Sequence, residues 1–365
     1  MKLLITVLCV LSIAFFSCQE TRHVADTSGN DTAKIVDPLY ITDSVAHDSD
    51  DPAVWVNPVD PSKSLILGTD KDEDGGLYVF DLKGKIVKDK VIRGLKRPNN
   101  VDVTYGLTLG GKSTDIAVVS ERFTHKLRIY ALPDMTPVDG GGIEVFVGQS
   151  GDGARDLMGI ALYKNRSGKV YAIAGRKSGP VDGTYLWQYL LEDDGRGRVK
   201  ATLVRKFGSY SGLKEIESIA VDNELGFVYY SDEGKGVRKY YADPEKGNRE
   251  LALFATTGFT EDHEGISIYK QTDSTGYILV SDQGANQFQI FPRAGESSDP
   301  NSHPLLKTVK VKASHSDGSD MVSVPLNDDF KNGLFIAMSD DKTFHLYRWE
   351  DIWGNGLKRS AGTAK

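Results

Sequence analysis

The sequence predicts an all-β protein built from six repeats, and two observations support this. Short apolar runs of the β type fill the chain from residue 35 onward, and no long amphipathic helical pattern interrupts them. In addition, an apolar strand ending in a polar triplet, followed by a turn and a second apolar strand, recurs along the chain. The strand ends fall at positions 70, 121, 176, 232, 282 and 340, which are separated by 51, 55, 56, 50 and 58 residues. Six copies at that period indicate a six-bladed β-propeller.

The final repeat has little room for a fourth strand. Only a short stretch of chain remains between its last apolar run and the glycine-containing tail, residues 354–365. We therefore expect residues 35–41 to supply the missing strand, so that the N-terminal and C-terminal parts pair and no sheet edge stays open. This closure predicts one domain over residues 35–353, preceded by a flexible linker over residues 19–34.

Residues 1–18 have the pattern of an export signal. Lys2 precedes a short apolar run that ends before Ser17 and Cys18, and a basic start, an apolar core and a small residue before the cut are typical of such signals. Cleavage before Cys18 resembles the processing of bacterial lipoproteins, which places a lipid anchor on that thiol. We expect an exported protein, anchored to a bacterial envelope membrane or, if the signal is a plain secretory one, periplasmic or secreted. Because Cys9 and Cys18 are the only cysteines, the mature domain has no disulfide.

The charge balance excludes one class of partner. The chain of 365 residues carries 51 acidic and 44 basic side chains, a net charge of −7 at pH 7. Proteins that bind nucleic acid generally present a basic face, so we expect no nucleic-acid partner. An acidic pocket for a cation fits this composition better. The sequence shows no oligomer interface, and we expect a monomer.

A second periodic feature is an acid or amide at the start of the short strand that opens each repeat. In a propeller these innermost strands begin at one end of the central channel, so the side chains would converge into a ring. Like charges at close range raise one another's pKa unless a cation neutralises them, and Ca²⁺ is the hard cation that carboxylates and amides bind. The pattern predicts several calcium ions, although Asp and Asn also begin strands and turns without a metal. The residues are Asp51, Asn100 with Asp102, Asp156, Glu217, Glu264 and Asp320.

Six short motifs follow one another along the chain: DDPAVW at 50–55, NNVD at 99–102, EIE at 215–217, DHEGISIY at 262–269, GYILVSDQG at 276–284 and DGSD at 317–320. This ordered set resembles the β-propeller phytases and covers nearly the whole mature chain. The resemblance implies a six-bladed propeller that hydrolyses inositol hexakisphosphate (phytate) or another polyphosphorylated small molecule, with several calcium ions at one end of its channel. It also implies in-line attack on phosphorus by a calcium-bridged water or hydroxide, without a phospho-enzyme.

The resemblance also implies which residues bind metal. The ions that act in catalysis would be held by Asp51, Glu217, Asp262 and Glu264. The full set of expected metal ligands is Asp50, Asp51, Asn100, Asp102, Glu217, Asp232, Glu233, Asp262, Glu264, Gln283, Asp317 and Asp320.

Basic side chains stand at the repeated strand ends of the first three blades. Lys71, Arg122 and either Arg176 or Lys177 align with the residues that hold substrate phosphates in the family. Their recurrence on neighbouring blades supports the same interpretation, because a cation at a strand end has no ordinary role in an apolar core.

Two further positions modify this site. Asp232 and Glu233 occupy the corner of the fourth blade that is equivalent to the basic strand ends, and they would complete the metal site. Met158 stands where relatives often carry a tyrosine, so a hydroxyl contact to the substrate is missing. This departure bears on substrate preference and leaves the predicted reaction class unchanged.

Two other functions remain compatible with the sequence. A calcium propeller of the lactonase or gluconolactonase type shares the fold and a central metal, but it needs no phosphate-binding cations. A non-catalytic surface-binding propeller would agree with the lipoprotein-like signal. Turnover of a lactone, or calcium-dependent binding of a polyphosphate without turnover, would distinguish these alternatives from a phytase.

Overall fold

The structure of the protein is a computed structural model that describes residues 34–354. The predicted export signal 1–18, with its anchor position Cys18, lies outside the described residues. Most of the predicted linker 19–34 and nearly all of the tail 354–365 also lie outside them.

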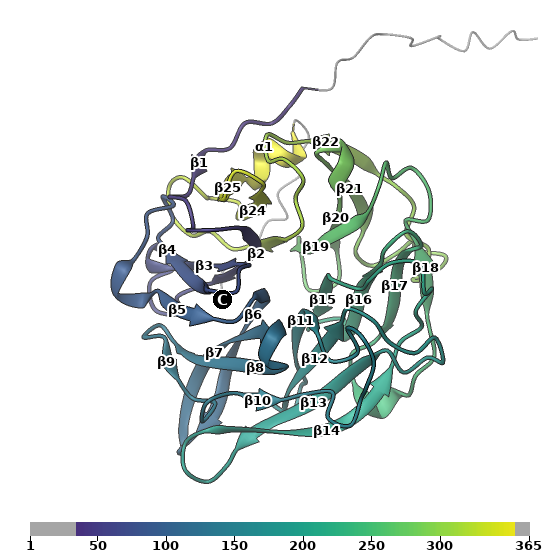
Figure 1. Ribbon diagram of the computed structural model, residues 1–365. Coiled ribbons are helices and arrows are strands. Elements are labelled where there is room, and N and C mark those ends of the chain that lie inside the picture. Colours follow the sequence, from purple (N-terminus) through teal and green to yellow (C-terminus); the bar gives the residue numbers. More distant parts are fainter. Residues whose placement is uncertain (1–33, 355–365) are drawn as a thin grey trace, which may run out of the picture. The chain divides into compact units, whose positions relative to one another are not determined.

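From residue 34 to residue 354 the chain forms six antiparallel sheets that follow one another around a central axis (Figure 1). Each sheet is a blade, and the predicted six-bladed all-β propeller is confirmed. Blades one to three comprise β2 (Ser49–Trp55), β3 (Leu65–Asp70), β4 (Gly75–Phe80) and β5 (Ile92–Leu95); β6 (Pro98–Leu109), β7 (Lys112–Glu121), β8 (Lys126–Leu132), β9 (Thr136–Pro137) and β10 (Ile143–Glu144); and β11 (Leu157–Lys164), β12 (Val170–Arg176), β13 (Leu186–Asp193) and β14 (Val199–Phe207).

Blades four to six continue the same order around the ring. The first strand of each blade lines the channel, and later strands lie progressively farther out. These blades comprise β15 (Ile219–Asp222), β16 (Phe227–Asp232), β17 (Gly236–Tyr241) and β18 (Ala252–Phe254); β19 (His263–Lys270), β20 (Gly276–Asp282), β21 (Gln287–Pro292) and β22 (Lys307–Lys310); and β23 (Ser319–Val322), β24 (Leu334–Ser339), β25 (Thr343–Arg348) and β1 (Tyr40–Ile41).

The N-terminal strand closes the ring, as predicted. β1 pairs antiparallel with β25, so that Tyr40 lies opposite Leu346. The Leu39 amide donates to the Leu346 carbonyl at 2.8 Å, and Val36 forms a parallel bridge with Val311 of blade five. The last blade is therefore completed by the N-terminal part of the chain, with β1 as its outermost strand.

Helical segments are short. The helix α1 (Trp349–Trp353) follows β25 and buries Trp349 and Ile352. Within residues 34–354, no helix is long and apolar enough to cross a membrane. Single 3₁₀ turns occur at Pro61–Lys63, Lys88–Lys90, Arg122–Thr124, Pro244–Lys246 and Gln283–Ala285.

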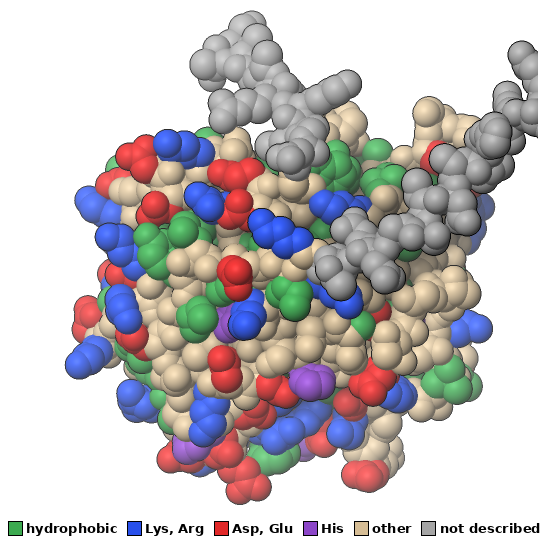
Figure 2. All heavy atoms as spheres, turned by 90° about the horizontal axis from the view of Figure 1, so that it is seen from above, with side chains coloured by type: hydrophobic (Ala, Val, Ile, Leu, Met, Phe, Trp, Pro, Cys, Tyr) green, Lys and Arg blue, Asp and Glu red, His purple; other side chains and the backbone are tan. Residues whose placement is uncertain are grey.

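Apolar side chains are buried between neighbouring blades. One cluster joins blades two and three through Ile116, Val118, Ala172 and Trp187, and equivalent clusters join the other neighbours around the described ring. The strands have apolar side chains on both faces because each blade is covered on both sides. The side of the molecule drawn in Figure 2 shows acidic and basic side chains intermixed, with single hydrophobic ones between them.

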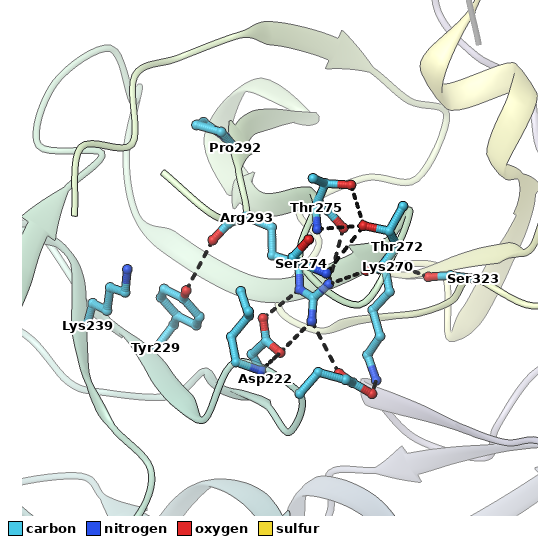
Figure 3. A network of polar contacts seen from close by, with 12 residues as sticks. Asp222, Tyr229, Lys239, Lys270, Thr272, Ser274, Thr275, Pro292, Arg293 and Ser323 are labelled. Atoms are coloured by element: carbon cyan, nitrogen blue, oxygen red, sulfur yellow. Dashed lines mark hydrogen bonds and ion pairs between the residues drawn. The ribbon is translucent and has the colours of Figure 1, made fainter. Parts of the chain in front are cut away.

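A buried ion pair also fastens blade four to blade five (Figure 3). Both Arg293 and Asp222 have fully buried side chains, and the guanidinium donates from Nε and Nη2 to the two carboxylate oxygens, each at 2.6 Å. Arg293 also donates to the carbonyls of Thr272 and Thr275 at 2.8 and 3.2 Å. The paired geometry satisfies most of the donors of a side chain that has no access to water.

We expect Arg293→Met to lower the free energy of unfolding by about 3–5 kcal/mol, because it leaves the Asp222 carboxylate buried without its counter-ion. Denaturant unfolding of the two proteins measures the difference. The double variant with Asp222→Asn removes the uncompensated charge and should recover part of the loss. A single variant as stable as the wild type would show that the pair does not stabilise the junction.

Candidate functional site

The described part of the chain has a cavity along the channel and another at one end of it. One, of about 870 Å³, is lined by the inner strands and by the turns that follow them. The other, of about 710 Å³, lies where the inner strands begin, and we call it the acidic mouth. Cations and carboxylates together line the acidic mouth: Arg97, Arg122, Lys177 and Lys214 with Asp152, Asp156, Glu215, Glu233 and Asp262.

Two groups of carboxylates among residues 34–354 lie close enough to share metal ions. Glu215, Glu217 and Glu233 form the first acidic cluster, and Glu233, Asp262 and Glu264 form the second. Within each cluster the ligand oxygens lie within 4.8 Å of one another. The structure thus brings together four residues that the sequence predicted as metal ligands, and it adds Glu215.

Bulges interrupt the starts of four inner strands, and one of them contains Glu264 of the second acidic cluster. The pairing of β19 with β20 skips residues 264–265, and β2, β6 and β11 have the same two-residue interruption at 50–51, 99–100 and 158–159. A bulge breaks the strict alternation of a strand and redirects its side chains. Gly159 takes the second bulge position because a Cβ there would lie 2.2 Å from a carbonyl oxygen of the next blade.

The first residue of each bulge contacts groups at the mouth. Asn99 donates from Nδ2 to Oε1 of Glu217 at 2.8 Å, although the two belong to different blades. Asp50 lies 2.5 Å from the Lys71 ammonium. Glu264 belongs to the second acidic cluster. Blades one, two, four and five therefore contribute to one site.

Burial and mutual repulsion perturb the clustered acids. Burial raises the pKa of Glu233 from 4.5 to about 9, and the neighbouring charges of Glu217, Glu215 and Asp262 add to this effect. The pKa of Glu264 is also raised well above its ordinary range, by burial first and then by Glu233 and Glu217. Carboxylates in such an environment resist ionisation unless a cation joins them.

Several oxygens in this site have no hydrogen-bond partner. Among the described residues, Asn99 Oδ1, Glu233 Oε1 and Glu264 Oε2 are buried and accept no hydrogen bond. Unpaired buried acceptors are costly, and a hard cation with oxygen ligands would satisfy them. The residues present therefore fit calcium.

Lys71 neutralises another acidic group at the same end of the channel. Its ammonium lies 2.5 Å from Asp50 and 3.1 Å from Asp317, and Gln283 donates from Nε2 to Asp317. Burial alone would lower the pKa of Lys71, but Asp50, Glu217 and Asp317 outweigh it and raise the pKa. The lysine is therefore a fixed positive charge beside the clusters.

The remaining cations occupy the wall of the acidic mouth. The Arg122 side chain is buried, with Nε donating to the Leu157 carbonyl at 3.4 Å and Nη2 contacting the Met158 sulfur. Lys177 is half exposed, and its ammonium lies 3.5 Å from Glu215. These two cations face the same cavity as the two clusters.

Two predicted site residues point elsewhere. Arg176 is fully buried inside blade three, where its guanidinium lies 4.7 Å from the centre of the Phe146 ring and donates to Gln149 at 2.9 Å. Asp232 accepts from the Arg238 Nε at 2.8 Å and from the Ser211 amide and hydroxyl. Both expected roles are corrected for the same reason: these side chains are committed to other protein groups.

Four other predicted ligands lie along the channel and line the 870 Å³ cavity. Asp51, Asp102 and Asp320 each accept a hydrogen bond from a backbone amide of the next inner strand, at 3.0, 2.7 and 2.7 Å. Burial raises the pKa of Asp102 to about 7 and that of Asp320 to about 6. The three carboxylates connect neighbouring blades, and they do not share the clusters of the acidic mouth. The fourth ligand is Asn100.

The family is shown by comparison with known proteins. The sequence model of the family described as Phytase matches residues 1–346, nearly the whole chain. The chain belongs to the phytase family. The predicted family is thereby confirmed, and with it an enzyme of the phytate-hydrolysing kind.

One relative of this phytase-family chain is the 3-phytase of Bacillus subtilis (strain 168). The two are 28% identical over 359 residues, which cover 93% of this chain and 88% of the relative. Among solved structures, the Dos1 propeller aligns with a TM-score of 0.42 and 12% identity over 85% of this chain and 69% of that one. A TM-score this low gives no information about the function of this protein.

Sequence reasoning missed three members of the phytase-family site. Glu215 stands in the EIE motif, two residues before Glu217, and that spacing is the signal that could have identified it. Asn99 precedes Asn100 in the same bulge, and only the structure shows which amide reaches Glu217. Lys214 had no signal, because its partner Asp262 lies 48 residues away.

The raised pKa values predict how stability depends on pH without metal. Between pH 4.5 and 9 the folded protein holds protons on Glu233 that the unfolded chain has released, so the free energy of unfolding should fall as pH rises through this window. Thermal unfolding in EDTA at pH 6 and pH 9 measures this. Glu233→Gln should flatten the dependence, and an identical slope in the variant would contradict the assignment.

Proposed function

We propose that this chain is a calcium-dependent phosphomonoester hydrolase that acts on phytate or another polyphosphorylated small molecule. The observation that carries the proposal is that members of both acidic clusters, Glu215, Glu233 and Asp262, line the same cavity as the cations Arg122 and Lys177. An acidic protein can bind a polyanion in this way, because the carboxylates bind the metal and the metal binds phosphate. The 3-phytase relative supports the substrate class.

The carboxylates of the two clusters would hold the metal. Calcium held there would supply Lewis-acid chemistry: it would activate a water for in-line displacement and disperse the negative charge that develops on the phosphate. Glu217, Glu233, Asp262 and Glu264 provide the oxygens, and Glu215 extends the first cluster. Asn99 orients Glu217 through the 2.8 Å hydrogen bond to Oε1, so that the other oxygen is left for the ion.

The cations would bind and orient the phosphates. A guanidinium donates two parallel hydrogen bonds to a phosphate, and Arg122 is held in place by the Leu157 carbonyl. Lys177 is half exposed, so its side chain can change position to contact a phosphate at the cavity wall. Lys71 adds a fixed charge beside Asp50. Met158 contributes a thioether where the family often has a hydroxyl, so phosphate binding rests on these cations.

Direct attack by water agrees with the lining of the cavity. Of the residues described in the structure, no histidine or cysteine lines the acidic mouth. A phosphohistidine or phosphocysteine intermediate therefore has no nucleophile beside the clusters.

The alternatives are less well supported by this geometry. A lactonase needs a central metal but no phosphate-binding groups, whereas Arg122 and Lys177 share the cavity with the clusters. A non-catalytic propeller would not need unpartnered carboxylate oxygens beside those cations. We also propose that the chain is exported and anchored through Cys18, which rests on the pattern of residues 1–18 alone.

We expect the protein to release inorganic phosphate from phytate in the presence of Ca²⁺ and to lose this activity in excess EDTA. Glu217→Ala should abolish release, because it removes a ligand from the first cluster, while the fold remains intact by circular dichroism. A colorimetric phosphate assay with a calcium titration measures both. Turnover of a lactone without phosphate release would instead favour the lactonase alternative.

We expect Arg122→Ala to reduce kcat/KM for phytate about 10- to 100-fold, because a charge-assisted hydrogen bond contributes about 1.5–3 kcal/mol. Lys177→Ala should act in the same direction. Lys200→Ala is a control, since Lys200 is exposed on β14 and pairs only loosely with Glu192, at 3.9 Å. Steady-state kinetics with unchanged kcat/KM in the Arg122 variant would remove that residue from the site.

A further inference from the structure

Lys214 holds a cluster carboxylate directly. Its ammonium contacts both oxygens of Asp262, with the Oδ2 contact at 2.6 Å, although the residues come from the loops ahead of two different blades. The Asp262 side chain is 18% exposed and the Lys214 side chain 51%. The lysine therefore covers the second acidic cluster from the solvent side.

The backbone beneath Lys214 is fixed, whereas its side chain is not. The Tyr210 hydroxyl donates to the Lys214 carbonyl, and the Glu233 amide donates to the Glu215 carbonyl at 3.2 Å. Among the described residues, the ammonium donates hydrogen bonds to Asp262 alone. It can leave Asp262 by rotation about side-chain bonds alone.

We propose that Lys214 competes with calcium for Asp262. Its ammonium occupies the Asp262 carboxylate in the metal-free protein and must leave before an ion binds the second acidic cluster. The inference rests on the proposed function in one respect, because it takes calcium as the metal of that cluster. In this role Lys214 sets the calcium affinity of the second acidic cluster, and it does not contact the reacting phosphate.

Charge and geometry both support competition. A carboxylate that offers both oxygens to an ammonium cannot offer them to a metal ion at the same time. Asp262 first, and then Glu233 and Glu264, raise the pKa of Lys214, so the ammonium interacts with every member of the cluster. Removing it takes a positive charge away from the second acidic cluster and favours a divalent cation in its place.

Lys214 differs from the other lysines at this end of the channel. Lys177 lies 3.5 Å from Glu215, a looser pair. Lys71 lies between two carboxylates and is only 14% exposed, so it has less freedom to leave. The close contact with Asp262 makes Lys214 the lysine that matters most for the second acidic cluster, and its exposure leaves the side chain room to move away.

Calcium titration of the full chain by isothermal calorimetry tests this, with Lys214→Met as the variant. If the pair is closed about nine-tenths of the time, its removal strengthens one calcium site about tenfold and leaves the others unchanged. Lys214→Arg should keep the wild-type affinity. Lys85→Met is the matched control, because it removes a lysine paired with Asp43 at 2.7 Å in blade one, away from the mouth.

The outcomes separate this inference from the proposed function. Unfolding midpoints in EDTA verify that each variant is folded. Calcium binding that is unchanged or weaker in Lys214→Met, or equally strengthened in Lys85→Met, overturns the competition. If neither wild type nor variants bind calcium at all, the proposed metal dependence fails, and the inference fails with it.

Discussion

The repulsion among buried carboxylates at one end of the channel is the constraint on which the rest of the site depends. Glu233 belongs to both acidic clusters, and its pKa of about 9 expresses the cost of charging it there. Without metal, this cost is offset by protons and by three lysines, Lys71, Lys177 and Lys214. The same charges would favour calcium, and calcium would displace Lys214 from Asp262 and attract a polyanionic substrate.

The propeller makes this concentration of charge possible because no blade contributes all of it. Asp50, Asn99, Glu217 and Glu264 come from four blades, and bulges at the starts of the inner strands aim three of them at the mouth. Rigidity between blades then keeps the acids together against their repulsion. The apolar clusters, the Asp222–Arg293 pair and the closing strand β1 provide that rigidity.

The repeat period was enough to predict the six blades and their closure, because each copy is one supersecondary unit with its own turn signals. The side-chain assignments were harder, since neighbouring residues of a strand point in opposite directions. Arg176 enters the core of its blade while Lys177 reaches the cavity, and Asp232 binds Arg238 while Glu233 joins the clusters. Loops that lie far apart in the sequence can still contact each other, as Lys214 and Asp262 do, and such contacts produce no local sequence pattern from which they could be predicted.

The most direct test of the account is a crystal structure of the calcium-loaded protein with anomalous scattering to locate the ions. We expect peaks between Glu215, Glu217 and Glu233 and between Glu233, Asp262 and Glu264, with the Lys214 ammonium moved away from Asp262. If calcium is bound elsewhere and both clusters keep their lysine partners, the clusters are not the metal site and the central claim is wrong.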